Sequence, residues 1–176
     1  STVNSATCFR TPGAILKKWR DELGLDAMSE KILDPYFDRV EKIINVTELT
    51  WDILGNNPKI VKRGCDSLGY TCRPLRHNVK DCRGCGPCQF GCPENAKQSV
   101  NVTYIPMADR FGARIYANCR AERIIARAGA AAGVEGSVVD PVTGRAVRRV
   151  NVSSKAVVVS CGALLTPSLL MWSGLA

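Results

Sequence analysis

The first part of the chain places apolar residues at helical spacing between glycine and proline breaks. Residues 14–23 form a short amphipathic run that ends at Gly24, a residue typical of helix ends. Ser29 opens a second run, with apolar side chains at i, i+3, i+4 and i+7 through Ile44. Pro35 lies inside that run and leaves open whether its first turn stands apart. Two further stretches have helical composition: residues 51–54 and 58–68.

Further along the chain, helical spacing gives way to the alternation of strands. Residues 96–110 still predict a helix, with a kink at Pro106 and a stop at Gly112. The β-type segments that follow are 114–117, 121–127, 134–139 and 146–152, the last two alternating around a turn at 140–144. The alternation on both sides of that turn predicts a β-hairpin.

The last apolar segment, residues 156–159, is continuous, as in a strand buried on both faces of a parallel sheet. It runs into Cys161-Gly162-Ala163, after which Thr166-Pro167 predicts a helix with proline at its first position. A buried strand, a glycine turn and a helix N-terminus together can receive a phosphate-bearing cofactor. The predicted fold class is therefore α/β, with an α+β arrangement in this stretch of chain.

The length and charge of the chain limit the kinds of binding partner that it can have. At 176 residues the chain is long enough for one domain with a sizeable core. The formal net charge of +8 would suit an acidic partner, but the basic runs 59–63 and 145–149 carry no interleaved aromatic residues. We therefore expect no nucleic-acid partner. No apolar run reaches the length of a membrane span and no signal peptide is visible, which leaves a cytoplasmic or a periplasmic location open.

The candidate chemistry is concentrated in one run of cysteines. Their spacing is C-x2-C-x2-C-x3-C followed by proline, the spacing of cubane iron–sulfur ligands in bacterial ferredoxins. The ligands that this spacing predicts are Cys82, Cys85, Cys88 and Cys92. Thiolates at every third residue, with glycines between them that can take positive φ, allow a short loop to wrap a compact cluster.

Other uses of the cysteines stay open. A structural zinc site usually pairs two C-x-x-C knuckles across a longer spacer, and only one compact run is present. Disulfides between such near neighbours have poor geometry and need an oxidising compartment, and four free thiols would be an unusual way to fill a core. Within the cluster hypothesis, both a three-iron (3Fe-4S) and a four-iron (4Fe-4S) form fit, and Cys92 either completes the cluster or is spare.

The C-terminal stretch, residues 162–175 (GALLTPSLLMWSGL), resembles the second signature of the glucose–methanol–choline (GMC) oxidoreductases, which are FAD-dependent alcohol dehydrogenases and oxidases. The family usually has glycine where this chain has Ala176. The opening Ser1-Thr-Val-Asn4, followed by residues 8–12 (CFRTP), resembles the flavin-lining segment after that family's Gly-Gly pair.

The middle of the chain is similar to the cysteine-bearing branch of the same family, which includes long-chain alcohol oxidases. The similarity runs from residues 91–97 through Tyr104-Ile-Pro106 to Gly112-Ala113. Some bacterial members of this family carry an iron–sulfur cluster on a cysteine loop at this place. The resemblance covers essentially all 176 residues.

The resemblance implies the middle portion of one FAD-binding domain. Its segments would be a flavin-lining stretch (1–12), a mostly helical part (13–80), the cysteine loop (81–97), and a part with a helix, strands and the signature (98–176). The family's N-terminal Gly-x-Gly-x-x-Gly and its C-terminal catalytic histidine have no match here. We interpret the single histidine, His77, as solvated or locally satisfied and not as a general base. We therefore expect no catalytic residue in this chain, which alone would be inactive.

The resemblance also implies cofactor contacts, each of which could instead be plain packing. Ser1, Thr2, Val3 and Asn4 would lie against the ribityl chain and isoalloxazine of FAD. The backbone of Ala121 would contact the adenine. The turn beside the FAD phosphates would be formed by Cys161, Gly162, Ala163 and Thr166.

The function implied is hydride transfer from an alcohol to flavin, with an iron–sulfur cluster relaying electrons to a cytochrome or another acceptor. The expected partners are a small alcohol, the remaining segments of the same enzyme and that acceptor. The alternative is a non-catalytic electron-transfer or structural module that holds an iron–sulfur cluster or zinc. A ferredoxin-type module would show a second cysteine run and a compact length, and neither is present here.

Overall fold

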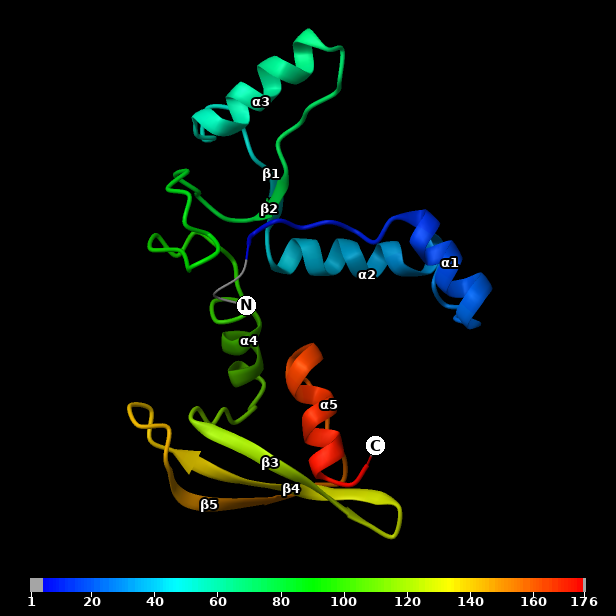
Figure 1. Cartoon of the computed structure of the whole chain (residues 1–176), viewed down its shortest axis with the longest axis vertical. Coiled ribbons are helices and arrows are strands. Elements are labelled where there is room, and N and C mark those ends of the chain that lie inside the picture. The colour runs from blue at the N-terminus through cyan, green and yellow to red at the C-terminus, as the bar shows by residue number, and fades with distance from the viewer. Residues whose placement is uncertain (1–4, 176) are drawn as a thin grey trace. The chain divides into compact units, whose positions relative to one another are not determined.

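The computed structural model of the protein describes residues 5–175, which fall into two compact units that divide between Ala113 and Arg114. Figure 1 shows the helices and strands of both. The described residues form five helices and two antiparallel sheets, which confirms a mixed helix and sheet fold. Within this described part, no helix is long and apolar enough to cross a membrane.

The first unit has four helices, and the first three follow the predicted pattern closely. The four are α1 (Gly13–Leu23), α2 (Glu30–Ile43), α3 (Asn56–Ser67) and α4 (Tyr104–Arg110). Helix α1 ends at Gly24, whose φ of 65° is the left-handed conformation that glycine adopts at low cost. Ser29 precedes α2 as its N-cap residue, and Pro35 lies inside α2 without interrupting it. The first turn of α2 is therefore not a separate element.

A small sheet that the sequence pattern did not predict lies between these helices. Strands β1 (Val46–Glu48) and β2 (Arg76–Asn78) pair antiparallel, and Figure 1 shows them side by side. The opening segment joins them through a bridge from Thr7 to His77. The buried core beside the sheet consists of Ala6, Leu49 and Val79, with Leu54, Cys82 and Cys88 packed against it. The cysteine loop is thus part of the core of this unit.

Two predicted helical stretches of the first unit are wrong in whole or in part. Residues 51–54 form turns and bends, and only the end of the 96–110 stretch is helical, as α4. Lys97 instead pairs with Val79, and the Gln98 N–H donates to the Asn78 carbonyl at 2.8 Å. These backbone groups are used by the neighbouring strand and are therefore not available for a helix.

The second unit is a three-stranded antiparallel sheet with one helix packed on its first strand. The elements are β3 (Cys119–Arg127), β4 (Ala130–Val139), β5 (Ala146–Ser153) and α5 (Gly162–Trp172), and the strand order is β3-β4-β5. The hairpin of β4 and β5 confirms the predicted one. Ser173 joins the helix end to the sheet, because its Oγ accepts the Ile124 N–H at 2.8 Å and donates to the Leu169 carbonyl at 2.6 Å.

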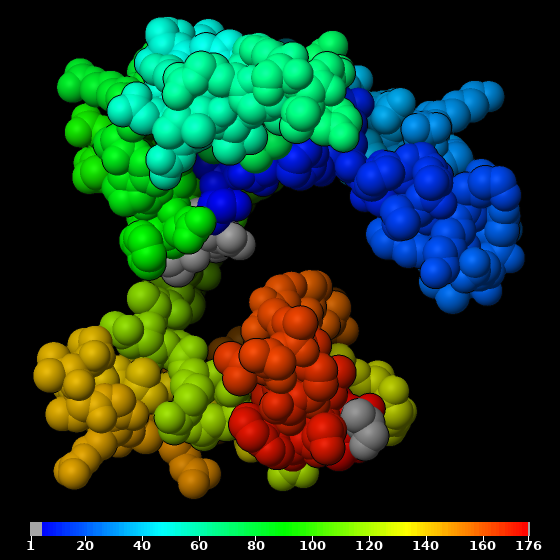
Figure 2. Space-filling view, turned by 45° about the horizontal axis from the view of Figure 1, so that its top comes forward, coloured from blue at the N-terminus to red at the C-terminus, as the bar shows by residue number. Residues whose placement is uncertain are grey.

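Three predictions for the second unit are wrong. Residues 114–117 and 156–159 are not strands, and Val158 is 89 % exposed. A strand buried in a parallel sheet needs neighbours on both sides, and no strand within residues 5–175 pairs with 156–159. Helix α5 begins at Gly162, so Pro167 lies inside it and not at its start. At this start, the Cys161 N–H donates a hydrogen bond to the Thr166 hydroxyl. Figure 2 shows α5 in orange and red.

Candidate functional site

The four cysteines of the predicted ligand set line a single cavity of about 750 Å³. The cavity lies in the first unit, between the cysteine loop and the segment that follows β1. Leu49, Ile53 and Leu54 form the wall on that side. The structure therefore places Cys82, Cys85, Cys88 and Cys92 on the wall of one cavity.

The cysteine side chains are all free thiols. Within residues 5–175, no three His, Cys, Asp or Glu side chains stand in an arrangement that could hold a metal ion. The four thiols share a cavity without forming a closed coordination shell. What the cavity offers is the donor type, because soft sulfur atoms are the ligands of iron–sulfur clusters and of structural zinc.

The backbone of the loop has the left-handed conformations that the sequence predicts. Gly84, Gly86 and Gly91 have φ angles of 72°, 94° and 122°. At Gly84 the reason is also steric, because an added Cβ would lie 2.2 Å from the carbonyl oxygen of Ile53. Glycine at this position allows the loop to approach the opposite wall of the cavity.

Backbone groups stabilise the Cys92 sulfur as a thiolate. Burial raises the pKa of this thiol, but backbone hydrogen bonds from Lys97, Glu94 and Ala96 outweigh it, and the net pKa is lowered. Several N–H groups that converge on one atom form an anion-binding nest of the kind found at many iron–sulfur sites. The sequence contains no signal for this nest beyond the Cys-Pro turn itself.

The pKa of Cys88 is shifted in the opposite direction, upward. Burial is the largest cause of its raised pKa, and the neighbouring thiols of Cys82 and Cys92 raise it further. Lys97 acts in the other direction and lowers the pKa of Cys88. Thiolates this close to one another need a positive partner, which a metal or a nearby cation can supply.

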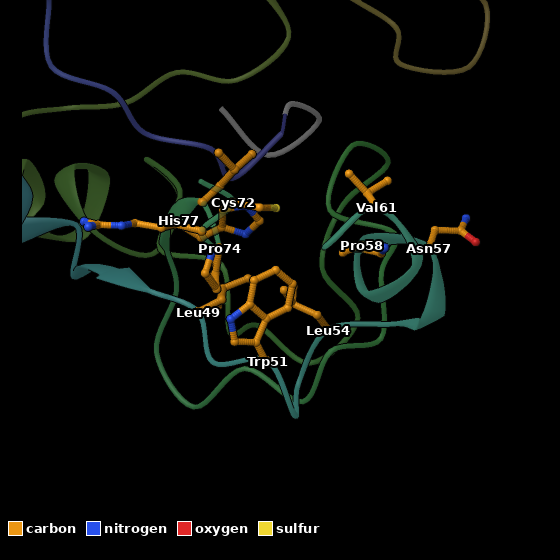
Figure 3. A pocket seen from close by; sticks show the side chains of 11 residues that line it. Leu49, Trp51, Leu54, Asn57, Pro58, Val61, Cys72, Pro74 and His77 are labelled. Atoms are coloured by element: carbon orange, nitrogen blue, oxygen red, sulfur yellow. The ribbon is translucent and has the colours of Figure 1, made fainter. Parts of the chain in front are cut away.

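A second, more apolar cavity of about 460 Å³ adjoins the first and shares five of its wall residues. Figure 3 shows the Trp51 ring beside Leu49 and Leu54 in this cavity. The shared residues are Leu49, Leu54, Asn57, Pro58 and His77. His77 therefore lies at the boundary between an apolar hollow and the cysteine cavity.

The surroundings of His77 differ from those that the sequence predicts. Its Nε2 lies 3.4 Å from the Thr7 hydroxyl, but Nδ1 is buried and has no hydrogen-bond partner in the part of the chain that the structure describes. Burial lowers the pKa of the imidazole, which favours the neutral form. The expectation of a solvated or locally satisfied histidine is thus wrong for Nδ1. The bridge that pairs this part of β2 with Thr7 joins residues far apart in the sequence, and no local pattern predicts it.

The predicted phosphate turn lies in the second unit, at the start of α5. The Cys161 N–H donates to Thr166 Oγ1 at 3.0 Å. Gly162 has a φ of 87°, and no heavy atom lies within 4 Å of where its Cβ would be. Together with the exposed Ala163, these residues leave an open helix N-terminus that fits a phosphate group.

The other predicted cofactor contacts are not part of this turn. Ala121 lies on β3, at a register shift opposite Gly136, and is exposed. A backbone contact from this strand fits the expectation, because a register shift leaves backbone groups without regular pairing. Ser1, Thr2, Val3 and Asn4 lie outside the described residues, as does Ala176.

Known proteins resemble the chain over its whole length. The model of the GMC oxidoreductase family matches residues 1–176. The uncharacterized GMC-type oxidoreductase Rv0492c of Mycobacterium tuberculosis is 40% identical over 175 residues, which cover 99% of this chain and 27% of that protein. The uncharacterized GMC-type oxidoreductase y4nJ of Sinorhizobium fredii is 35% identical over 173 residues, or 98% of this chain and 34% of that protein.

A plant relative carries a more specific name. The long-chain-alcohol oxidase FAO3 of Arabidopsis thaliana is 29% identical over 181 residues, which cover 99% of this chain and 24% of that protein. The chain thus spans about a quarter to a third of the length of the curated relatives it matches.

Proposed function

The chain belongs to the GMC oxidoreductase family, and from this premise we propose that it forms part of an FAD-dependent alcohol dehydrogenase or oxidase. The observation that carries the proposal is the family match across residues 1–176. The relatives named long-chain-alcohol oxidase support a CH–OH group as the site of oxidation. FAD, when bound, supplies the acceptor for the hydride of the alcohol.

The residues of this chain would bind and orient the flavin. The first turn of α5, with Cys161, Gly162, Ala163 and Thr166, would hold the phosphates of FAD against backbone N–H groups. Its open space and the positive φ of Gly162 support this role. The backbone of Ala121 would contact the adenine, and Ser1, Thr2, Val3 and Asn4 would line the ribityl chain and isoalloxazine.

The cysteine loop adds a proposed electron relay. Cys82, Cys85, Cys88 and Cys92 would hold an iron–sulfur cluster, which supplies one-electron transfer to a cytochrome or another acceptor. Their spacing, their common cavity and the positive-φ glycines support this proposal. The backbone hydrogen bonds to the Cys92 sulfur favour Cys92 as a ligand over a spare thiol. The non-catalytic alternative gains no support from the family match.

The proposal is tested by composition and by flavin reduction in the complete polypeptide that contains this chain. Iron, acid-labile sulfide, zinc and FAD are measured on anaerobically prepared protein, together with an EPR spectrum. We expect FAD and near-equal amounts of iron and sulfide, and bleaching of the flavin absorbance on anaerobic addition of an alcohol. Flavin that no alcohol reduces would contradict the dehydrogenase or oxidase.

A matched pair of variants tests the cysteine loop separately from the flavin chemistry. C85S removes a proposed ligand, whereas C119S changes an exposed cysteine of the second unit. We expect C85S to lose the cluster and to slow acceptor reduction, and C119S to retain both. Zinc in place of iron, or equal iron content in the two variants, would contradict the electron relay and leave the flavin chemistry untouched.

A further inference from the structure

A buried lysine contacts the cysteine loop from inside the protein. Lys97 is 3 % exposed, and its Nζ donates a hydrogen bond to the Cys88 carbonyl at 2.6 Å. Lysine is almost never this deeply buried unless its charge has a partner, because removing an ammonium group from water is costly. The same side chain lines the cavity that holds the four thiols.

The fold fixes Lys97 on both sides along the backbone. Lys97 forms a bridge with Val79, and the Lys80 N–H donates to the Ala96 carbonyl at 2.8 Å. Asn78 then closes the other side, since it accepts the Gln98 N–H at its carbonyl and donates from Nδ2 to the Gln98 carbonyl at 3.0 Å. Lys97 is therefore held against β2, in the best-packed part of this unit.

Lys97 contacts two of the cysteine positions by different groups. Its ammonium binds the carbonyl of Cys88, and its backbone donates to the sulfur of Cys92. The residue thus spans the C-x3-C end of the run, where the loop returns to the core. The bond to the Cys88 carbonyl depends on the lysine side chain, whereas the bond to the Cys92 sulfur comes from the backbone and would survive a substitution.

The other charged residues that line the cavity are in contact with water. Arg83 is the second cation of the lining, but its side chain is 80% exposed and lies 3.8 Å from the carboxylate of Glu94. Water and salt screen such exposed charges, so they contribute little to the potential inside the cavity. A desolvated charge is screened much less, and among the cations of the lining it is Lys97 that lowers the pKa of Cys88.

We propose that Lys97 is the positioning residue of the cysteine loop: its ammonium ties the loop at Cys88 and balances, inside the protein, part of the negative charge of the thiolate-bound group. The second half of this inference rests on the proposed function, because the identity of the bound group comes from there. The first half concerns the loop alone and holds for the metal-free protein.

The hydrogen bond from Lys97 to the cysteine loop is tested by hydrogen exchange on the metal-free form of the complete polypeptide. K97M removes both donor and charge, and K97Q keeps a donor on a side chain of similar size. K80Q is the matched control, because it removes a positive charge from an exposed lysine on the segment that pairs with residues 96–97. We expect the amides of residues 82–92 to exchange about tenfold faster in K97M, as loss of a hydrogen bond from a charged group implies. K80Q should exchange like the wild type.

The effect of the Lys97 charge is tested by an EPR-monitored redox titration of the protein that carries the cluster. Removing a positive charge beside the cluster disfavours its reduced form, so K97Q should have a more negative midpoint potential while K80Q keeps that of the wild type. A purely structural role would lower the iron content without moving the potential of the clusters that remain. K97Q also serves where K97M fails to fold.

The outcomes separate the two proposals. Exchange in K97M at the wild-type rate would overturn the role of Lys97 whatever the metal content, and so would an unchanged potential in K97Q. A wild-type protein without iron and sulfide would instead refute the cluster. The exchange comparison would then still decide whether Lys97 holds the loop.

Discussion

Glu41 and Arg76 form a two-pronged ion pair, in which Arg76 Nη1 and Nη2 each lie 2.9 Å from one carboxylate oxygen of Glu41. Arg10 donates to the same carboxylate from Nε at 2.9 Å and from Nη2 at 2.7 Å. One carboxylate on α2 therefore joins the opening segment to strand β2. That strand also carries His77 and precedes the cysteine loop. The ion-pair cluster of Glu41, Arg10 and Arg76 therefore holds together the segments beside the candidate site.

We expect E41Q to lower the stability of the first unit by about 2 kcal/mol, because two guanidinium groups lose charged acceptors in a half-buried place. The matched control is E48Q, since Glu48 is exposed on β1. Urea unfolding at pH 7 measures the difference. Equal midpoints for E41Q and E48Q would show that the cluster contributes nothing measurable.

The same cluster predicts a pH dependence. Hydrogen bonds from Arg10, and then from Arg76, lower the pKa of Glu41 from 4.5 to about 2. A lowered pKa in the folded state means that the stabilisation is complete above the unfolded pKa and is lost as the pH falls toward 2. Unfolding midpoints measured between pH 5 and pH 2 should therefore fall more steeply for the wild type than for E41Q. Parallel curves would contradict this.

The cysteine loop depends on glycine at position 84. An alanine there would place its Cβ 2.2 Å from the Ile53 carbonyl oxygen and would also keep a positive φ. We expect G84A to move the loop away from the cavity wall and to lose most of the bound metal. G86A is the control, because its φ is also positive but no atom lies within 4 Å of the added Cβ. Metal content at equal protein concentration separates them, and equal losses would count against the steric reason.

The elements that were predicted correctly are those with local signals. Helices α1 and α2 carry their own end signals in Gly24 and Ser29, and the β4–β5 hairpin carries its turn. The three-residue strands β1 and β2 pair across a connection that contains α3, and the opening segment adds a bridge from Thr7 to His77, so no local signal marks them. Residues 156–159 have the composition of a buried strand, but burial also needs partner strands.

In the candidate site, too, features with a local signal were predicted and features that depend on distant segments were not. The spacing of the cysteines predicts that they share a cavity, since a short loop determines it locally. The buried ammonium of Lys97 and the Nδ1 of His77, which has no hydrogen-bond partner within residues 5–175, lie instead where segments far apart in the sequence meet. The sequence pattern places Lys97 at the end of the cysteine loop and at the start of a predicted helix, and it presents His77 as a solvated or locally satisfied residue.

In the second unit, Ser173 holds α5 to the sheet. Its hydroxyl accepts the Ile124 N–H and donates to the Leu169 carbonyl, and the residue is buried. We expect S173A to cost about 1–3 kcal/mol, since it leaves a buried N–H without an acceptor. S168A is the control, because its hydroxyl makes a similar bond to the Leu164 carbonyl on the exposed side of the same helix. Faster hydrogen exchange at Ile124 in S173A alone would support this role, and no difference would refute it.

His77 gives the last prediction, in which the sign of the pH effect is decisive. Burial lowers the pKa of its imidazole below the ordinary 6.5, so the unfolded chain takes up a proton at a pH where the folded chain does not. The stability contributed by the neutral ring is therefore complete above about pH 6.5 and is lost as the pH falls further. H77Q, which cannot titrate in this range, should lack this loss. We expect the difference in unfolding midpoint between wild type and H77Q to be constant above pH 7.5 and to shift against the wild type at pH 5.5. A difference that does not change with pH would show that the ring is solvated in both states, and with it the boundary between the two cavities would be open to water.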